Sequence, residues 1–143
     1  MQYTRYFYVD DNQQTIENVK ALLRKYPRYK RISKRKAGQL KSPSMDGMPR
    51  SDSYGNQIES KIINQIEAEQ IVMGCQYSIE AIEDSECRKI LYDKYIKGYE
   101  DTAIRLSMHM PERTYYRKLK KACLSFADVY GWQELRVQHI YKR

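Results

Sequence analysis

Four polar side chains between residues 110 and 131 recur at i, i+3, i+4 and i+7, a spacing that gathers them on one face of a helix: Arg113, Tyr116, Arg117 and Lys120. An arginine can donate two parallel hydrogen bonds to a guanine edge, and arginine and lysine can both neutralise a phosphate. Lys121 flanks this face, and no carboxylate follows Glu112 on it. The chemistry that this face offers is therefore recognition of an anionic, acceptor-rich surface.

The helix that must position these side chains is predicted to run from Pro111 to Tyr130. Proline suits the first turn of a helix because its missing N–H would have no intrahelical partner there, and Gly131 supplies a stop. Apolar residues share a different face of the same helix: Tyr115, Leu119, Ala122, Phe126 and Val129. This stripe predicts that the helix packs on a core and leaves its basic face outward.

A short helix from Glu100 to Met108 and a three-residue turn with His109 precede this longer helix. A short helix, a turn and a longer helix form the helix-turn-helix pattern, whose second helix lies in the DNA major groove. We predict base contacts from Glu112, Arg113, Tyr116 and Arg117, and phosphate contacts from Thr114, Lys120 and Lys121. The alternative that this pattern leaves open is a helical bundle with a solvated basic face.

Charge is distributed in blocks along the 143 residues. Residues 1–50 carry 12 basic and 4 acidic side chains, residues 51–100 carry 5 and 10, and residues 101–143 carry 9 and 4. The formal net charge of +8 favours a polyanionic partner, although solubility alone can also explain excess charge. Solubility alone predicts no such blocks, so two basic ends around an acidic middle indicate a functional surface, for which double-stranded DNA is the expected partner.

The most basic segment is residues 24–36, where eight of thirteen side chains are Lys or Arg and none is acidic. Tyr26 and Tyr29 are interleaved with them, where they could pack on sugars or bases. This segment predicts an arm that neutralises phosphates, unless it is a solvated helix end and a flexible linker. The candidate phosphate contacts of the arm are Arg28, Lys30, Arg31, Lys34, Arg35 and Lys36.

Hydrophobic periodicity predicts an all-α protein. Residues 1–36 form a helical basic arm whose helix stops at Pro27, after a short strand at 3–9, and residues 37–56 form a flexible linker rich in Gly, Pro and Ser. Residues 57–131 contain a long helix from Gln57, another helix capped by Asp84 or Ser85, and the two helices described above. Residues 132–143 form a basic tail whose structure the sequence does not specify. The apolar stripe of the long helix is a core face or a seam between two copies: Ile58, Ile62, Ile66, Val72, Met73, Cys75, Ile79 and Ile82.

No residue pattern in the chain indicates catalysis, a metal or a cofactor. The three cysteines are far apart and lie in helical segments, which is typical of small buried residues. The two histidines lie near no nucleophile or metal-ligand motif. The start of the sequence is unlike a signal peptide, and no apolar run approaches the ~20 residues of a membrane span, so we expect a cytoplasmic protein with no membrane partner.

The run "ILYDKYIKGYEDTAIRLSMHMPERTYYRKLKKACLSFADVYG" resembles the helix-turn-helix of sigma factor region four. With "DGMPRSDSYGN" and "TIENVKALLRKYPR" upstream, the chain is more similar to the ArpU family of phage-encoded transcriptional regulators. This resemblance, over about residues 15–131, implies a DNA-binding regulator of phage genes, often late genes. By this resemblance, the residues of the recognition helix that would contact DNA are Glu112, Arg113, Thr114, Tyr116, Arg117, Lys120 and Lys121. Two residues depart from the family: His109 stands where glycine is frequent, and Pro111 where a small capping residue is common.

Two other functions remain open from the sequence. An RNA-binding antitermination protein would use the basic arm and its tyrosines, because aromatic rings stack on unpaired bases. A protein that contacts RNA polymerase would use the acidic middle, and this role is compatible with DNA binding. A homodimer through the stripe of the long helix would imply two symmetric half-sites on DNA.

Overall fold

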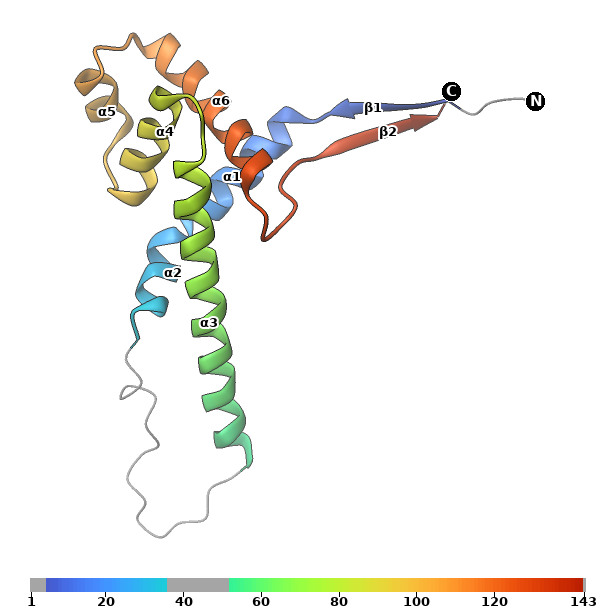
Figure 1. The fold of residues 1–143 in the computed structure, drawn as a ribbon, viewed down its shortest axis with the longest axis vertical. Helices are drawn as coiled ribbons and strands as arrows, with labels where there is room; N and C mark the ends of the chain where they lie inside the picture. The colour runs from blue at the N-terminus through green and yellow to red at the C-terminus, as the bar shows by residue number, and fades with distance from the viewer. Residues whose placement is uncertain (1–4, 36–51, 143) are drawn as a thin grey trace.

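A computed structural model describes residues 5–35 and 52–142, and helices dominate it (Figure 1). The all-α prediction is confirmed, with the addition of one small two-stranded sheet. The helices form a body at one end of the molecule, from which the long helix α3 and the two-stranded ribbon extend in different directions (Figure 1). Of the linker predicted at 37–56, residues 37–51 lie outside the described residues. The prediction is wrong for residues 52–56, which form the start of the long helix.

The N-terminal helices are α1 (Asn12–Arg24) and α2 (Tyr26–Ser33). Asp11 caps α1, since its carboxylate accepts a hydrogen bond from the Gln14 N–H at 3.0 Å. The prediction that Pro27 ends helical structure is wrong, because Pro27 lies in the first turn of α2. A proline is tolerated at that position, where no intrahelical partner for its N–H exists.

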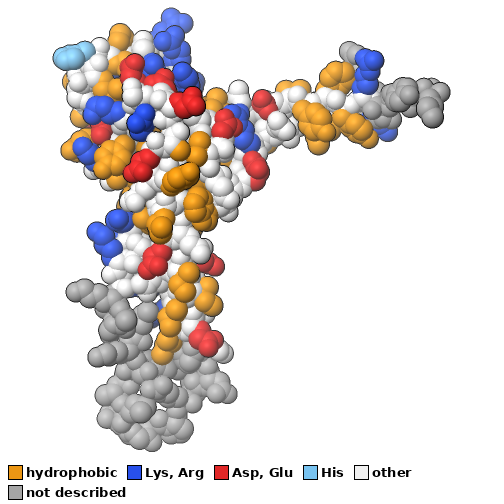
Figure 2. All heavy atoms as spheres, viewed as in Figure 1, with side chains coloured by type: hydrophobic (Ala, Val, Ile, Leu, Met, Phe, Trp, Pro, Cys, Tyr) orange, Lys and Arg blue, Asp and Glu red, His pale blue; other side chains and the backbone are white. Residues whose placement is uncertain are grey.

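The long helix α3 (Asp52–Glu80) begins five residues earlier than the expected start at Gln57. The apolar residues predicted to form one stripe lie on two different faces of this helix. Val72, Cys75 and Ile79 are buried in the core, whereas Ile62, Ile66 and Met73 are exposed. Figure 2 shows the exposed apolar side chains along the outward surface of α3.

The next elements are α4 (Ser85–Leu91), the π-helical turn η2 (Tyr92–Ile96), α5 (Asp101–Ser107) and α6 (Glu112–Val129). Gly98, after η2, has φ +77°, which a glycine adopts without strain. These elements agree with the boundaries expected from the sequence to within a residue or two, except that the π turn was not expected.

One hydrophobic core joins both ends of the chain. Val19 and Leu23 of α1 are fully buried in the same cluster as Phe126 of α6 and Leu135 near the C-terminus. Helix α2 lies along α3, and α1 lies against α6 (Figure 1). The residues expected to form an N-terminal arm therefore contribute to the core that supports α6.

The sheet pairs β1 (Tyr6–Asp10) with β2 (Gln138–Lys142) in antiparallel register, with Val9 opposite His139. The predicted strand at 3–9 is thus confirmed for residues 6–9, and its partner is the tail whose structure the sequence left open. All ten side chains of this ribbon are exposed, and it projects from the helical body (Figure 1). Hydrogen bonds tie its base to α1: the Asp11 N–H donates to the Val137 carbonyl at 2.8 Å, and Asn18 donates to the Leu135 carbonyl at 3.1 Å.

Gly74 allows the segment before β2 to cross α3 closely. A Cβ at this position would lie 2.7–3.0 Å from three ring carbons of Trp132. Because these separations are shorter than van der Waals contact, any larger residue at position 74 displaces the indole ring. The glycine therefore fixes where the C-terminal segment leaves the helical body.

Candidate nucleic-acid interface

Helix α6 has one buried face and one exposed face, as its sequence predicts. Tyr115, Ala122 and Phe126 are completely buried, and Leu119 is 3% exposed. The predicted outer residues are exposed: Glu112, Arg113, Tyr116, Arg117, Lys120 and Lys121. Thr114 is half-buried at the flank. Tyr116 is held in edge-to-face contact with Tyr115, with the ring centroids 5.2 Å apart.

The basic residues of α6 fall into two electrostatic groups. Lys121 donates to the Asp84 carboxylate at 3.2 Å, and Lys118 lies 3.4 Å from both Asp84 and Glu86. In contrast, the charges of Arg113, Arg117 and Lys120 have no ion-pair partner within the described part of the chain. The three cations without a partner are therefore those of the outward face, and a ligand can bind them without displacing an internal pair.

Asp84 connects the start of α4 to the middle of α6. Its carboxylate accepts from the Glu86 and Cys87 N–H groups, at 2.9 and 3.2 Å, as the predicted helix cap. The backbone hydrogen bond from Cys87, together with those from Lys121, Glu86 and Lys118, holds the pKa of Asp84 well below its usual range. The carboxylate is therefore charged at neutral pH and keeps Lys118 and Lys121 on the α4 side of the helix.

A second polar network fixes α6 against α5 and η2. Lys94 donates to both carboxylate oxygens of Asp101, at 2.7 and 2.8 Å, and the Tyr115 hydroxyl donates to the same group at 2.6 Å. Partial burial would raise the pKa of Asp101, but these hydrogen bonds from Lys94 and Tyr115 hold it below its usual value. Burial, and then the bond to Asp101, raise the pKa of Tyr115, so its hydroxyl remains a donor.

The turn between α5 and α6 closes α5 with a Schellman arrangement. The Met110 N–H donates to the Arg105 carbonyl at 3.0 Å, and the His109 N–H donates to the Leu106 carbonyl at 3.2 Å. His109 has φ +52°, and Met110 is 7% exposed and anchors the turn in the core. The turn thus places a non-glycine residue at positive φ, and the backbone strain of His109 is offset by two hydrogen bonds and one buried side chain.

Replacing His109 by glycine is expected to raise the free energy of unfolding by about 1 kcal/mol, because glycine adopts positive φ without the Cβ clash. The His109 side chain is exposed, so little packing is lost. Urea denaturation of the wild type and of His109→Gly measures the difference. Equal or lower stability of the variant would show that the turn does not strain the histidine.

The candidate arm residues are carried by α2 and the segment after it. Arg28, Arg31 and Lys34 are exposed, whereas Lys30 and Arg35 are half-buried. Lys36 lies outside the described residues. The expectation that Tyr26 could pack on nucleic acid is wrong, because Tyr26 is 3% exposed and its hydroxyl accepts from Gln76 at 2.7 Å. Tyr29, the other tyrosine of the basic segment, is half-buried against the same core.

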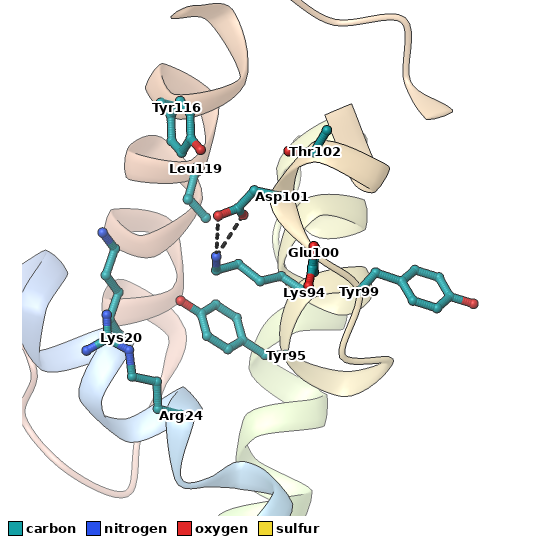
Figure 3. Close-up of a pocket in the computed structure, with 10 residues that line it drawn as sticks. All are labelled: Lys20, Arg24, Lys94, Tyr95, Tyr99, Glu100, Asp101, Thr102, Tyr116 and Leu119. Carbon is teal, nitrogen blue, oxygen red and sulfur yellow. Dashed lines mark hydrogen bonds and ion pairs between the residues drawn. The ribbon is translucent and has the colours of Figure 1, made fainter. Parts of the chain in front are cut away.

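Sequence reasoning missed two basic residues near the outer face of α6. Lys20 and Arg24 of α1 lie one helical turn apart and line a cleft together with Tyr116 (Figure 3). Their i, i+4 spacing was visible in the sequence, but only the packing of α1 on α6 brings them into the same cleft as Tyr116. Lys118 was also missed, because its partners Asp84 and Glu86 are more than 30 residues away in the chain.

The cysteines are buried, as expected, and are not paired with one another. Burial raises the pKa of Cys75 to about 12 and that of Cys123 to about 11, so both are protonated at neutral pH. Among the described residues no group of His, Cys, Asp and Glu side chains could hold a metal ion. Within the same part of the chain, no helix has the length and apolar character needed to cross a membrane.

Comparison with known proteins points to a class of regulatory proteins. The chain is 29% identical over 125 residues to a protein of Enterococcus hirae, a match that covers 84% of this chain and 88% of the relative. It is 26% identical over 131 residues to a protein of Streptococcus phage O1205, covering 90% of this chain and 95% of the relative. Both relatives are named "Putative autolysin regulatory protein ArpU". These similarities support the ArpU family and suggest a regulatory role at the level of the family. No family model and no solved structure matches the chain.

Proposed function

We propose that this protein is a sequence-specific double-stranded DNA-binding regulator of phage or prophage transcription, acting on late genes. In this proposal α5 and α6 form a helix-turn-helix of the sigma region-four type, and α6 enters the major groove. The regulatory names of the two relatives support a role of this kind. The helices α1 and α3 would serve as the support that holds α6 in a fixed orientation.

The observation that carries the proposal is the outer face of α6. Arg113, Arg117 and Lys120 are exposed there, and no described residue pairs with their charges. On the flank of the same helix the lysines are compensated, since Asp84 of the neighbouring element pairs with Lys121. An uncompensated face opposite a rigid core fits a duplex, which supplies acceptors and negative charge together.

The proposed roles follow from position and chemistry. Near the start of α6, Glu112, Arg113, Tyr116 and Arg117 would meet base edges, with the arginines directed at guanine. Lys120, Thr114 and the arm residues on α2 would hold phosphates. Lys121 would contribute less than Lys120, because its ammonium is already bound to Asp84.

The two other functions gain unequal support. The exposed apolar face of α3 favours a protein contact in addition to DNA, either with RNA polymerase or with a second copy. The RNA-binding alternative has less support, because the burial of Tyr26 removes one of the two rings available for stacking on bases.

A binding experiment separates these functions. The purified protein is titrated into labelled duplexes from a phage or prophage genome that encodes it, and into single-stranded RNA of the same length, over a series of salt concentrations. We expect the protein to bind the duplex with an affinity that falls steeply as the salt concentration increases, because phosphate contacts release counterions. Binding of RNA but not of duplex would overturn the proposal in favour of antitermination. Binding of neither would leave the protein-contact function.

A further inference from the structure

The cleft beside α6 is built from four elements. It has a volume of about 680 Å³ and opens to solvent between α1, η2, α5 and α6. Figure 3 shows Lys20 and Arg24 on one side, the pair of Lys94 and Asp101 near the middle, and Tyr116 at the end formed by α6. The cleft is thus continuous with the outer face of α6 through Tyr116.

The charges that line the cleft are not balanced internally. Both oxygens of Asp101 are bound by Lys94, and one of them also accepts from Tyr115, so the hydrogen bonds of this acid go to these two residues. Lys20 is near enough for its charge to help lower the pKa of Asp101, but it forms no ion pair with that carboxylate. Lys20 and Arg24 form no ion pair or side-chain hydrogen bond with any residue that the structure describes. Glu100 is the other acid of the lining, and its side chain is exposed.

A neutral donor completes the site. The hydroxyl of Tyr95 points across the cleft toward the side that carries Lys20 and Arg24 (Figure 3). Burial raises the pKa of Tyr95 above its usual value, so this hydroxyl stays protonated and can donate a hydrogen bond. One guanidinium, one ammonium and one hydroxyl around an open space match the needs of a phosphate group, which accepts several hydrogen bonds and carries negative charge.

We propose that this cleft is a phosphate site, in which Lys20 and Arg24 bind a backbone phosphate of the DNA strand that borders the groove entered by α6. This inference rests on the proposed function, because the phosphate that the site binds would come from the DNA backbone. Its position explains why two cations of α1 lie unpaired beside the helix proposed to read DNA. It also gives α1 a direct role, since this helix would clamp the duplex as well as support α6.

The test compares two variants that each lose two positive charges. Lys20→Gln/Arg24→Gln removes the cations of the cleft, and Lys61→Gln/Lys142→Gln removes two exposed lysines from α3 and β2. Binding to a short duplex of random sequence is measured over a salt series, with thermal melting to confirm that both variants are folded. We expect the cleft variant to bind roughly 10–100-fold more weakly and to lose about two units of salt slope, while the control changes little.

Inorganic phosphate serves as the second probe. We expect it to shift the amide NMR signals of the cleft residues in the wild type and not in Lys20→Gln/Arg24→Gln. If the wild type binds duplex and both variants keep the same salt slope, the DNA phosphate site is overturned while the proposed function stands. If the wild type binds no duplex but phosphate shifts the cleft signals, the cleft takes free phosphate and both the DNA source and the proposed function fail. If neither probe binds, the cleft is not a phosphate site.

Discussion

Replacement of Arg113 by alanine is expected to weaken binding to a cognate duplex by about 1–3 kcal/mol, if its guanidinium makes a bidentate contact with guanine. The same variant is expected to lose little affinity for a duplex of random sequence. The physical reason is that a base contact is made only on the right sequence, whereas a phosphate contact is made on all of them. Arg113 is exposed and unpaired among the described residues, so its removal should not disturb the fold.

Two further variants make this result interpretable. Lys120→Ala is expected to weaken cognate and random duplexes alike and to reduce the salt slope by about one unit. Arg5→Ala removes an exposed arginine beside the ribbon and serves as the charge-matched control. Fluorescence anisotropy with both duplexes measures all three variants. Equal losses on the two duplexes for Arg113→Ala would make Arg113 a phosphate contact rather than a base contact.

Leu23→Ala is expected to lower the free energy of unfolding by about 2–5 kcal/mol, the cost of deleting a fully buried leucine and leaving a cavity. Leu23 is 0% exposed and shares its core with Phe126 of α6. A loss of this size is a large fraction of the ~5–15 kcal/mol that stabilises a typical domain. The variant should therefore bind DNA poorly at moderate temperature because the support of α6 is weakened.

The matched control is Leu106→Ala, which removes the same atoms from a side chain that is 61% exposed. Surface substitutions of this kind usually change stability by no more than about 0.5 kcal/mol. Urea denaturation followed by helical circular dichroism measures both variants. If the two leucine variants lost similar stability, α1 would be a separate arm rather than part of the core.

The helices around the proposed interface were predictable because their information is local. The stripe that contains Tyr115 and Phe126 and the cap at Asp84 both depend on residues within one or two turns. The positive φ of His109 follows from the same local pattern of a helix end and a short turn. These features required no knowledge of how the helices pack together.

The features that the sequence could not reveal depend on distant partners. The exposed strand β1 pairs with β2, which is more than 120 residues away, and no local pattern specifies that pairing. Pro27 is compatible with the end of one helix or the first turn of another, and packing of α2 on α3 decides between them. Both faces of α3 are apolar, so the periodicity could not tell the buried face with Cys75 from the exposed face with Ile66.

The electrostatics of the candidate site were predictable only in part. The outer face was identified from residue spacing, but the division between paired and unpaired cations was not. Lys120 and Lys121 are both predicted phosphate contacts, but Asp84, 37 residues earlier in the chain, pairs with Lys121 alone of the two. Arg24 belongs to the basic segment recognised in the sequence and Lys20 does not, but the packing of α1 places both in the lining of one cleft with Tyr116.

An amide NMR titration of the wild-type protein, with a duplex enriched from a random-sequence library, tests most directly whether α6 is the DNA-reading helix. The proposal predicts that the largest shifts lie at the first turns of α6, around Arg113, Tyr116 and Arg117, with smaller shifts at Lys20 and Arg24. Shifts confined to α3 or the ribbon, with α6 unchanged under conditions of saturated binding, would contradict it.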